Sequence, residues 1–369
     1  MTLKVDYSYL PRQFADIDPY LEEIRQLVTS GDFTLGAAVG EFEERFAKVC
    51  GLPYAVGVGS GTDALILSLK LMGVGPGDEV ITTPNTFIAT VGAIAMTGAK
   101  PVFVDNNDVY TIDVNKIEAA ITPATKAILP VHLSGHPADM PAIMEIAKRH
   151  NMVVVEDAAQ AILAAIDGKP VGSWAEAAAF SLHPLKNLNV WGDGGIIATK
   201  SKDTYEKLRL FRNHGLSSRD DVAMFGHNSR LDSLQAVVGN RLIDEVYSIT
   251  DQRIANANKL DQGLGALGEC VVIPPRQPHI KQVYHTYVIQ VSDRDALLAH
   301  LLQNGVDAKV HYPIPLHLQP AAKDLGYKPG DFPVCEEHCR TILSLPAHQH
   351  LTQDEIDYMV ECVGDFYRG

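Results

Sequence analysis

The chain has 369 residues, of which 46% are hydrophobic and 21% are charged, and its formal net charge at pH 7 is −14. This length predicts about two domains with a sizeable core, and the high apolar share excludes a disordered chain. The acidic charge argues against nucleic acid or an anionic membrane surface as a partner.

The sequence also bears on location and on metal binding. No run approaches the ~18 apolar residues that a membrane span needs, and the first residues do not resemble a signal peptide. The five scattered cysteines fit reduced thiols, so we expect a cytoplasmic protein. Cys335 and Cys339 flank His338 at helical spacing, but a second ligand pair is missing. This favours buried cysteines on a helix over a metal site, and we expect no metal.

The first two thirds of the chain alternate between helical and strand-like segments. Apolar residues at helical spacing predict helices over 41–50, 62–72, 139–150 and 202–214. Short apolar runs predict strands over 79–83, 101–104, 127–133, 152–155, 177–182 and 195–199. Pro130 weakens the third of these strands. The alternation predicts an α/β fold with a mostly parallel sheet flanked by helices.

The pattern changes after about residue 240. A long helical stretch reaches about residue 267, and proline-rich segments then surround a predicted strand over 286–291. An amphipathic helix is predicted over 352–367. We therefore expect a large α/β domain at 1–240, including the N-terminal segment, and a smaller α+β domain at 241–369.

A first motif, GSGTDAL over 59–65, places small residues directly before a predicted helix. Free main-chain N–H groups at a helix start, together with the helix dipole, form a binding site for phosphate. The alternative is that Thr62 or Asp63 simply caps the helix. The motif matches neither a Walker A loop nor G-x-G-x-x-G, so it does not support those nucleotide sites.

A second motif, EDAAQ over 156–160, follows the predicted strand 152–155. Ligands of open α/β sheets bind beyond the carboxyl ends of the strands, where Asp157 is expected. Its carboxylate would keep a heterocyclic nitrogen protonated, and Gln160, one helical turn further on, would face the same ligand. The alternative is that one carboxylate caps the next helix.

A third motif, SLHPLKN over 181–187, places Lys186 after an apolar strand and before the glycine-rich GDGG. Burial there would lower the pKa of the lysine and leave a neutral amine that condenses with aldehydes. The alternative is an ordinary surface lysine. Together the three motifs require a ligand with a phosphate, a protonated ring nitrogen and an aldehyde. Pyridoxal 5′-phosphate (PLP) has all three.

These motifs belong to a resemblance that runs nearly end to end. It includes FTLGAAVGEFEERFA, GSGTDAL, PNTFIAT, PVFVD, ILPVHLSGHPADM, VVEDAAQA, FSLHPLKN with GDGG, GHNSRLDSLQA and VHYPIPLHLQP. With these segments the chain resembles the DegT/DnrJ/EryC1/StrS sugar aminotransferases, which have the fold-type I fold of aspartate aminotransferase. The resemblance implies a PLP-dependent enzyme that works as a homodimer.

The resemblance also implies roles for catalytic residues. Lys186 would form the Schiff base with PLP and later move the proton between substrate and cofactor. Asp157 would bind the pyridinium nitrogen, and His183 would lie close to cofactor and substrate. Some relatives that dehydrate sugars carry histidine in place of this lysine, so Lys186 favours amino transfer over dehydration.

Further cofactor contacts follow from the same resemblance. Gln160 would lie near the phenolic oxygen of PLP, and Phe87 would stack on its ring. Three residues would hold the phosphate: Gly61, Thr62 and Ser181. Asn228 would reach the phosphate from the neighbouring subunit, so that the active site is shared within a homodimer.

The chain departs from the family pattern after the lysine. Many members read K-N-L-G-A-x-G-D-G-G, whereas here Asn189, Val190 and Trp191 replace smaller residues. Trp191 either reshapes the substrate pocket or only fills space. Further substrate candidates are Arg230, His311, Tyr312 and His317, each of which is otherwise a structural or surface residue.

The resemblance implies a reaction that moves an amino group from L-glutamate to a keto-sugar, usually nucleotide-linked, and TDAL with PNTFIAT resembles members that act at C3 more than those that act at C4. An oxidised octulosonate of lipopolysaccharide synthesis is an alternative acceptor. Two other enzyme classes are disfavoured: a PLP-dependent dehydratase by Lys186, and an NAD-dependent dehydrogenase by the missing G-x-G-x-x-G. A non-catalytic regulator on the same fold is disfavoured by the intact lysine, aspartate and glutamine.

Overall fold

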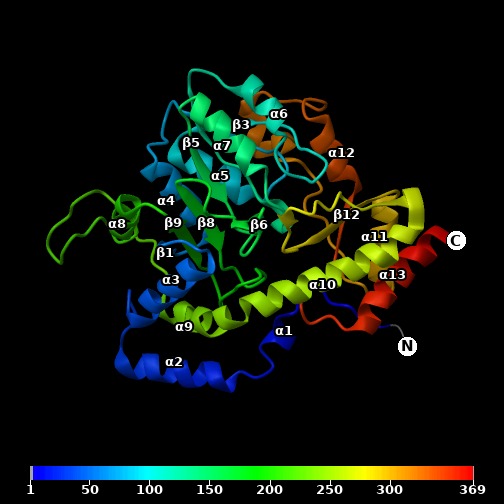
Figure 1. The fold of residues 1–369 in the computed structure, drawn as a ribbon, viewed down its shortest axis with the longest axis horizontal. Helices are drawn as coiled ribbons and strands as arrows, with labels where there is room; N and C mark the ends of the chain where they lie inside the picture. Colours follow the sequence, from blue (N-terminus) through cyan, green and yellow to red (C-terminus); the bar gives the residue numbers. More distant parts are fainter. Residues whose placement is uncertain (1–2, 369) are drawn as a thin grey trace.

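A seven-stranded sheet forms the centre of the computed structural model, which describes residues 3–368 (Figure 1). The strand order is β1-β9-β8-β5-β4-β2-β3. The bounds are Tyr54–Val58 (β1), Glu79–Thr82 (β2), Lys100–Phe103 (β3), Thr125–Ile128 (β4), Val153–Asp157 (β5), Ala177–Ser181 (β8) and Gly195–Thr199 (β9). All neighbouring pairs are parallel except those of β9, which runs antiparallel to β1 and β8. The prediction of a mostly parallel sheet is confirmed.

Helices cover both faces of this sheet because successive strand residues point to opposite sides. Val155, Ala177 and Ile197 pack beneath α4 (Gly61–Leu71), α5 (Ile88–Thr97) and α8 (Lys202–Phe211). On the other face, Ala178 and Ile196 pack beneath α3 (Ala37–Val49) and α9 (Ser233–Leu242). Farther along that face, α7 (Met140–Arg149) covers β4 and β5.

Two predicted boundaries differ from the structure for local reasons. The strand predicted over 127–133 ends at Ile128, and Val131 forms only an isolated bridge to Asp157. Pro130 cannot donate a ladder hydrogen bond, which explains the early end. The long helix predicted after residue 240 is broken into α9, a 3₁₀ turn at Ile243–Glu245 and α10 (Val246–Leu264).

The smaller elements complete the chain. They are α1 (Leu10–Gln13), α2 (Asp18–Ser30), α6 (Val114–Ile117), β6 (Ala165–Ile166), β7 (Lys169–Pro170), β11 (Ile280–Lys281) and five further 3₁₀ helices: Glu118–Ala120, Leu133–Gly135, Gly265–Cys270, Leu316–Leu318 and Pro320–Leu325. The three short strands form a separate sheet in the order β11-β6-β7.

A second core lies in the C-terminal part. Its sheet has the order β10-β12-β13, with β10 at Val271–Val272, β12 at Tyr287–Val291 and β13 at Ile342–Leu345. Three helices accompany it: α11 (Arg294–Gln303), α12 (Pro333–Thr341) and α13 (Gln353–Arg368). Val5 joins this core from the other end of the chain, and its N–H donates to the Gly305 carbonyl at 2.9 Å.

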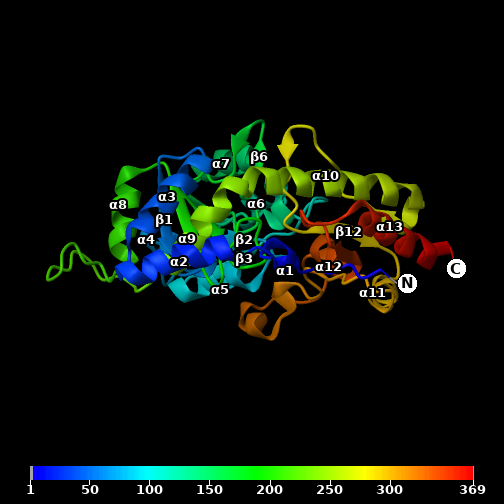
Figure 2. The same ribbon diagram turned by 90° about the horizontal axis from the view of Figure 1, so that it is seen from below.

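The long helix α10 connects the two cores (Figure 2). Val246 and Ile249 are buried in the large core, whereas Leu260 and Leu264 are buried in the small one. The division at residues 240 and 241 therefore stays a prediction, since α10 contributes to both cores.

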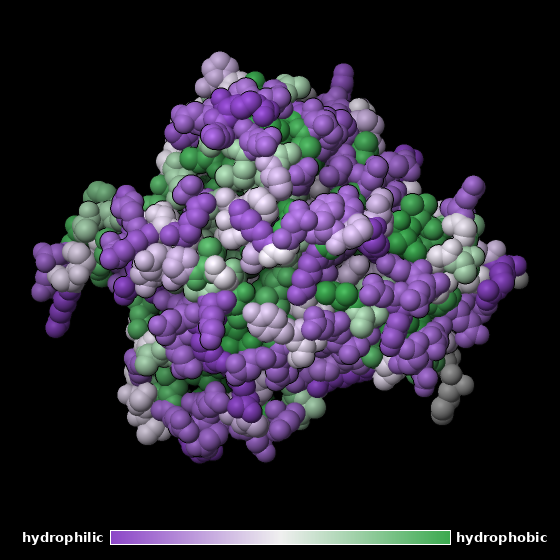
Figure 3. All heavy atoms as spheres, in the orientation of Figure 1, coloured by the Kyte–Doolittle hydropathy of each residue, from purple (hydrophilic) through white to green (hydrophobic). Residues whose placement is uncertain are grey.

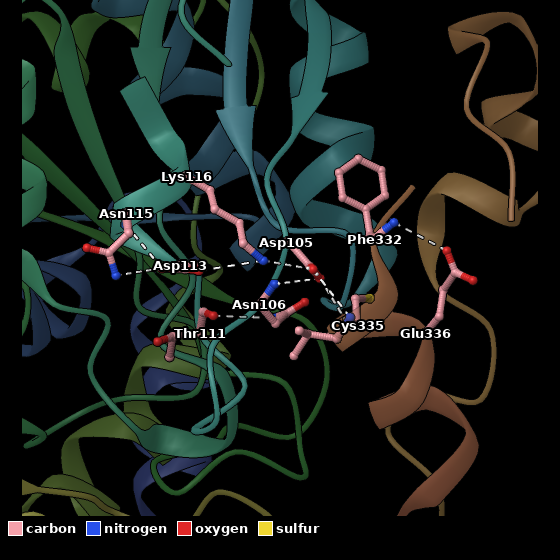
Figure 4. A network of polar contacts seen from close by, with 10 residues as sticks. Asp105, Asn106, Thr111, Asp113, Asn115, Lys116, Phe332, Cys335 and Glu336 are labelled. Atoms are coloured by element: carbon pink, nitrogen blue, oxygen red, sulfur yellow. Dashed lines mark hydrogen bonds and ion pairs between the residues drawn. The ribbon is translucent and has the colours of Figure 1, made fainter. Parts of the chain in front are cut away.

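A polar network joins α12 to the end of β3 (Figure 4). The Asp105 carboxylate accepts hydrogen bonds from the main-chain N–H groups of Val334 and Cys335 at the first turn of α12, at 3.3 and 2.9 Å. Lys116 Nζ donates to the same carboxylate at 3.1 Å. A carboxylate at a helix N-terminus complements the helix dipole, so Asp105 fixes α12 against the large domain.

The cysteines of α12 lie behind this contact. Cys335 and Cys339 are buried in an apolar cluster with Phe103 and Phe332, as predicted for cysteines on a helix. Within residues 3–368, no group of three histidine, cysteine or acidic side chains is arranged to hold a metal ion. No helix in the same range is both long and apolar enough to cross a membrane.

A protruding segment between α8 and α9, residues 213–230, is called the arm here (Figure 1, Figure 2). Isolated bridges join Asn213 to Asn228 and Leu216 to Val222, so the arm folds back on itself. Phe225 of the arm is 97% exposed. Where the arm extends, at the left of Figure 3, hydrophobic atoms lie at the surface among hydrophilic ones.

Candidate active site

The predicted lysine lies in the loop of residues 182–194, called the lysine loop here, between the central strands β8 and β9. The Lys186 N–H donates to the His183 carbonyl at 2.8 Å, and the Val190 N–H donates to the Leu182 carbonyl at 2.9 Å. These bonds fold the loop back over the end of β8. Asp157 ends the neighbouring strand β5, so both residues lie at the same edge of the sheet.

The start of α4 meets the end of β8 at the same edge. A Cβ atom added to Gly61 would lie 2.7 Å from Ser181 Cβ, so this close approach requires glycine. Gly61 and Thr62 occupy the first turn of α4, where main-chain N–H groups have no partner within the helix. Ser181 faces the same turn, and the three predicted phosphate residues are therefore brought together. The cradle fits an anion such as a phosphate.

The Asp157 carboxylate is held by one donor on each oxygen. The Thr90 hydroxyl donates to Oδ2 at 2.7 Å, and the Ala159 N–H donates to Oδ1 at 3.2 Å. Asp157 is 5% exposed, and this burial raises the pKa of the carboxyl, against the opposing effects of Thr90, Ala159 and Lys186. Each oxygen keeps a free acceptor position. A protonated ring nitrogen fits this carboxylate as a partner.

Lys186 carries the amine that the sequence predicted. Burial lowers the pKa of Lys186 to about 8, and the nearby Asp157 charge opposes this shift. Its Nζ makes no hydrogen bond or ion pair with any residue between 3 and 368. The amine is therefore free for a ligand, and a larger fraction of it is neutral near physiological pH than for a solvated lysine.

Aromatic and amide side chains border this centre. The Phe87 ring is 52% exposed, and its centroid lies 6.0 Å from that of Tyr312. Gln160 Oε1 accepts a hydrogen bond from the Ser134 N–H at 2.6 Å. Burial and the Asp157 charge raise the pKa of Tyr312, and a hydrogen bond with Gln160 opposes them. Tyr312 thus lies near both Gln160 and Asp157.

Two histidines lie near the lysine. His183 is exposed, and loss of hydration followed by the Lys186 charge lowers its pKa. His311 lies 2.9 Å from the Ser344 hydroxyl through Nδ1, and burial together with Lys186 lowers its pKa to about 4. His311 is therefore neutral at pH 7.

Four predicted residues are not brought to this centre by the single chain. Asn228 is exposed at the base of the arm, and Arg230 donates to Asn213 Oδ1 at 3.2 Å. The Trp191 ring packs against Phe14 and Tyr20, with centroid distances of 5.5 and 5.2 Å. His317 is buried in the cluster around α12, and its Nε2 lies 3.1 Å from Glu336 Oε1.

The local structure decides two alternatives that the motifs left open. The N-cap of α4 is Ser60, whose hydroxyl accepts from the Asp63 N–H at 3.0 Å, so neither Thr62 nor Asp63 caps the helix. No helix begins directly after Asp157, where turns follow β5. Gln160 is therefore carried by a turn and not by the helical spacing that we expected, and Asp157 caps no helix.

Several residues around the centre were missed from the sequence. Thr90, which binds Asp157, lies three residues after Phe87 in the PNTFIAT motif, so this motif could have indicated it. Tyr9 and Asn189 bind the main chain of Lys186, but Tyr9 lies 177 residues before it. No local pattern links residues so far apart.

The model of the DegT/DnrJ/EryC1/StrS aminotransferase family matches residues 16–364 of this chain. The chain belongs to this family. The match covers both cores and every predicted site residue.

Relatives of known name extend the match. A dTDP-3-amino-3,4,6-trideoxy-α-D-glucose transaminase of Streptomyces venezuelae is 40% identical, over 96% of this chain and 95% of the relative. A pleiotropic regulatory protein of Geobacillus stearothermophilus is 43% identical, over 97% of each chain. The crystal structure of S. venezuelae DesV in complex with a ketimine intermediate superposes with a TM-score of 0.97 at 38% identity, covering 100% of both chains.

These findings confirm three predictions made from the sequence: the family, the fold-type I fold and the class of enzyme, an aminotransferase. In this DegT/DnrJ/EryC1/StrS member, the individual roles of the site residues remain predictions. The geometry supports Lys186, Asp157, Gly61, Thr62, Ser181, Phe87 and Gln160 as one group.

Proposed function

We propose that this protein is a PLP-dependent aminotransferase that moves an amino group from L-glutamate to C3 of a nucleotide-linked keto-sugar. One observation carries the proposal: a free lysine amine with a lowered pKa lies beside a buried carboxylate and a helix N-terminus. The cofactor is PLP, as in the family. Amination at C3 is supported by the name of the S. venezuelae relative.

The residues of this chain would divide the work. Gly61, Thr62 and Ser181 bind the cofactor phosphate, and the Asp157 carboxylate holds a proton on the ring nitrogen. When bound, the cofactor supplies an electron sink. Lys186 provides the amine that binds its aldehyde and then moves the proton at the substrate carbon. His183 and Gln160 line the same space, and Phe87 covers the ring.

We further propose a homodimer whose arm reaches the active site of the partner. Asn228 is exposed at the base of the arm and meets none of the other predicted phosphate residues within its own chain. Apolar side chains are also exposed on the arm and on α5, including Phe225 and Met96. Burial of such side chains favours association. The five free cysteines support a cytoplasmic location.

Roles in sugar binding belong to the residues near the lysine. His311 and Tyr312 border the centre within one chain, and Arg230 would approach it with the arm of the partner. Trp191 and His317 pack away from Lys186, so we propose structural roles for them.

Absorption spectroscopy tests the proposal. The purified protein with PLP is expected to show a visible band that L-glutamate converts to the band of pyridoxamine phosphate. The loaded protein is then mixed with dTDP- and UDP-linked 3-keto-sugars and with an oxidised octulosonate, and mass spectrometry identifies the aminated product. A band that never responds to glutamate would contradict amino transfer and favour the regulatory activity that the G. stearothermophilus relative is named for.

A further inference from the structure

The main-chain carbonyl of Lys186 accepts two side-chain hydrogen bonds. The Tyr9 hydroxyl donates to it at 2.9 Å and Asn189 Nδ2 at 3.1 Å. Asn189 Nδ2 also donates to the Tyr9 hydroxyl oxygen at 3.3 Å, so one NH₂ group serves both partners. Asn189 is fully buried and Tyr9 is 3% exposed, so loss of one of these bonds would leave a buried polar group without a partner.

The Asn189 amide continues into a chain of further amides. Asn189 Oδ1 accepts from Gln13 Nε2 at 3.0 Å, and Gln13 Oε1 accepts from Gln349 Nε2 at 3.1 Å. Gln349 Oε1 accepts from Arg253 Nε at 3.1 Å. The bonds cross from α10 and the loop before α13, through the N-terminal segment, to the lysine loop.

Arg253 decides in which direction each amide of this series donates its hydrogen bond. A guanidinium group only donates hydrogen bonds, whereas an amide group donates at one end and accepts at the other. Gln349 must therefore turn its oxygen to Arg253 and its NH₂ to Gln13, and each following amide must turn the same way. The last amide, Asn189, therefore donates a hydrogen bond from its NH₂ group to the Lys186 carbonyl.

Arg253, the first donor of this series of hydrogen bonds, is itself held in place. Arg253 is 2% exposed, and its Nη1 donates to the Tyr284 carbonyl at 3.2 Å. The Arg253 guanidinium carbon lies 5.0 Å from the centre of the Tyr9 ring, which is within the range of a cation–π contact. The network thus closes on Tyr9, which also binds the Lys186 carbonyl.

The residues after Lys186 that differ from the usual family pattern belong to this network or pack beside it. Asn189 stands where many members have glycine, and Trp191 occupies the variable position two residues further on. Asn189 binds Gln13, and Trp191 packs against Phe14 and Tyr20 in the same N-terminal segment. Both side chains therefore attach the N-terminal segment to the lysine loop.

We propose that Gln349, Gln13 and Asn189 form a one-way hydrogen-bond relay that fixes the main chain of Lys186 and so positions its amine for reaction. The relay touches only the main chain of Lys186, so these three are positioning residues. Small displacements of a reacting group cost rate even when the fold is kept. The inference rests on the proposed role of Lys186 as the residue that binds the PLP aldehyde.

Two variants test the relay in the full-length protein loaded with PLP. Asn189→Leu removes the last donor. Gln349→Glu, far from the amine, cannot donate to Gln13, so the following amides turn around and Asn189 presents its oxygen to the Lys186 carbonyl. For each variant we expect kcat per bound cofactor to fall about tenfold, with KM for glutamate within about twofold. Combining the two variants should add no further loss, because each already breaks the same relay.

A readout without turnover accompanies the kinetics. The apoprotein is mixed with PLP, the adduct is trapped with borohydride at set times, and modification of Lys186 is measured by mass spectrometry. Both variants should form the adduct more slowly than the unsubstituted protein. If the unsubstituted protein traps no adduct at Lys186, the proposed function fails. If it traps the adduct and both variants match its rate, only the relay fails.

Asn106→Leu is the matched control. Asn106 is likewise a buried amide that donates to main-chain carbonyls, those of Tyr110 and Thr111, but it lies in the network behind α12 (Figure 4). We expect this control to lower thermal stability while keeping kcat per bound cofactor. An Asn189→Leu variant that loses stability but keeps kcat, as the control does, would overturn the positioning role.

Discussion

The lysine loop and the arm are both irregular segments next to the central sheet, yet they are held in opposite ways. The lysine loop is anchored by main-chain bonds to β8 and by Tyr9 and Asn189. The arm extends into solvent, with Phe225 97% exposed. The groups proposed for proton transfer are thus positioned within one chain, whereas the contribution of the arm to the phosphate site, as proposed above, would need a second copy.

Removing the amine tests the first half of this comparison most strongly. For Lys186→Ala we expect amino transfer to fall by at least about 10⁴-fold, because no other group binds the PLP aldehyde and moves the proton. The fold should survive, since Lys186 Nζ has no partner within the described chain. Steady-state kinetics and thermal unfolding measure both effects, with the exposed Lys126→Ala as control. Sustained turnover by Lys186→Ala would refute the assignment.

The carboxylate beside the amine comes next. For Asp157→Asn we expect the half-reaction with glutamate to slow by about 10³-fold, because a neutral ring is a poorer electron sink. Cofactor should still bind, since the phosphate cradle is unchanged. Stopped-flow absorbance measures the half-reaction, and an unchanged rate would exclude the proposed role of Asp157.

The pH dependence of the amine sharpens the contrast between a buried and a solvated lysine. Burial lowers the pKa of Lys186 to about 8, so the reactive neutral form is present above that pH and is lost below it. We expect labelling of Lys186 in the apoprotein by fluorodinitrobenzene to rise with pH with a midpoint near 8. In the denatured protein the midpoint should lie near the ordinary lysine value of about 10.4. Equal midpoints in the two states would argue against desolvation.

The second half of the comparison concerns the arm. For Asn228→Ala we expect a weaker affinity for PLP, by about tenfold, because one hydrogen bond to the phosphate is lost. Mixing this variant with Lys186→Ala tests whether sites are shared. If Asn228 serves the partner, random hybrids assayed at a PLP concentration too low to load the Asn228→Ala homodimer should recover about a quarter of full activity, since half of the dimers are hybrids and each has one intact site. No recovery after subunit exchange would place Asn228 in its own chain's site.

The smallest expected effect is that of the hydroxyl behind Asp157. Thr90→Val keeps the shape of the side chain but removes the donor at 2.7 Å. We expect the half-reaction with glutamate to slow a few-fold, and Thr90→Ser to restore it, because Asp157 loses one donor but keeps its charge and the hydrogen bond from the Ala159 N–H. Failure of the serine variant to restore the rate would indicate that Thr90 acts through packing.

Much of the fold and of the candidate active site could be predicted because short stretches of sequence determine it. Asp157 is the last residue of the apolar strand β5, Lys186 lies in the loop that follows β8, and the small residues before α4 mark its start. Such local signals predicted six of the seven strands of the central sheet, the phosphate cradle and the two reacting groups, but β1 (Tyr54–Val58) was missed. Gln160 was predicted by helical spacing, although a turn carries it to the same place.

The rest depends on contacts between distant parts of the chain. The proline-rich segment that follows α11 contains both His311, near Lys186, and His317, which packs against Phe332 at the start of α12. Nothing in its residue pattern separates the two histidines. The bond from Tyr9 to Lys186 likewise joins residues 177 positions apart. Side chains whose roles are set by which domain they face could be found only from the fold.

The continuity of α10 has a consequence for recombination between relatives. This helix of 19 residues begins in one core and ends in the other, and Val5 enters the second core from the opposite end of the chain. The C-terminal part is therefore not a cassette that can be exchanged at a loop. A functional chimera must take α10 and the first residues of the chain from the same parent as the C-terminal part. The segments that must stay together are those that share a core, even where they are far apart in the sequence.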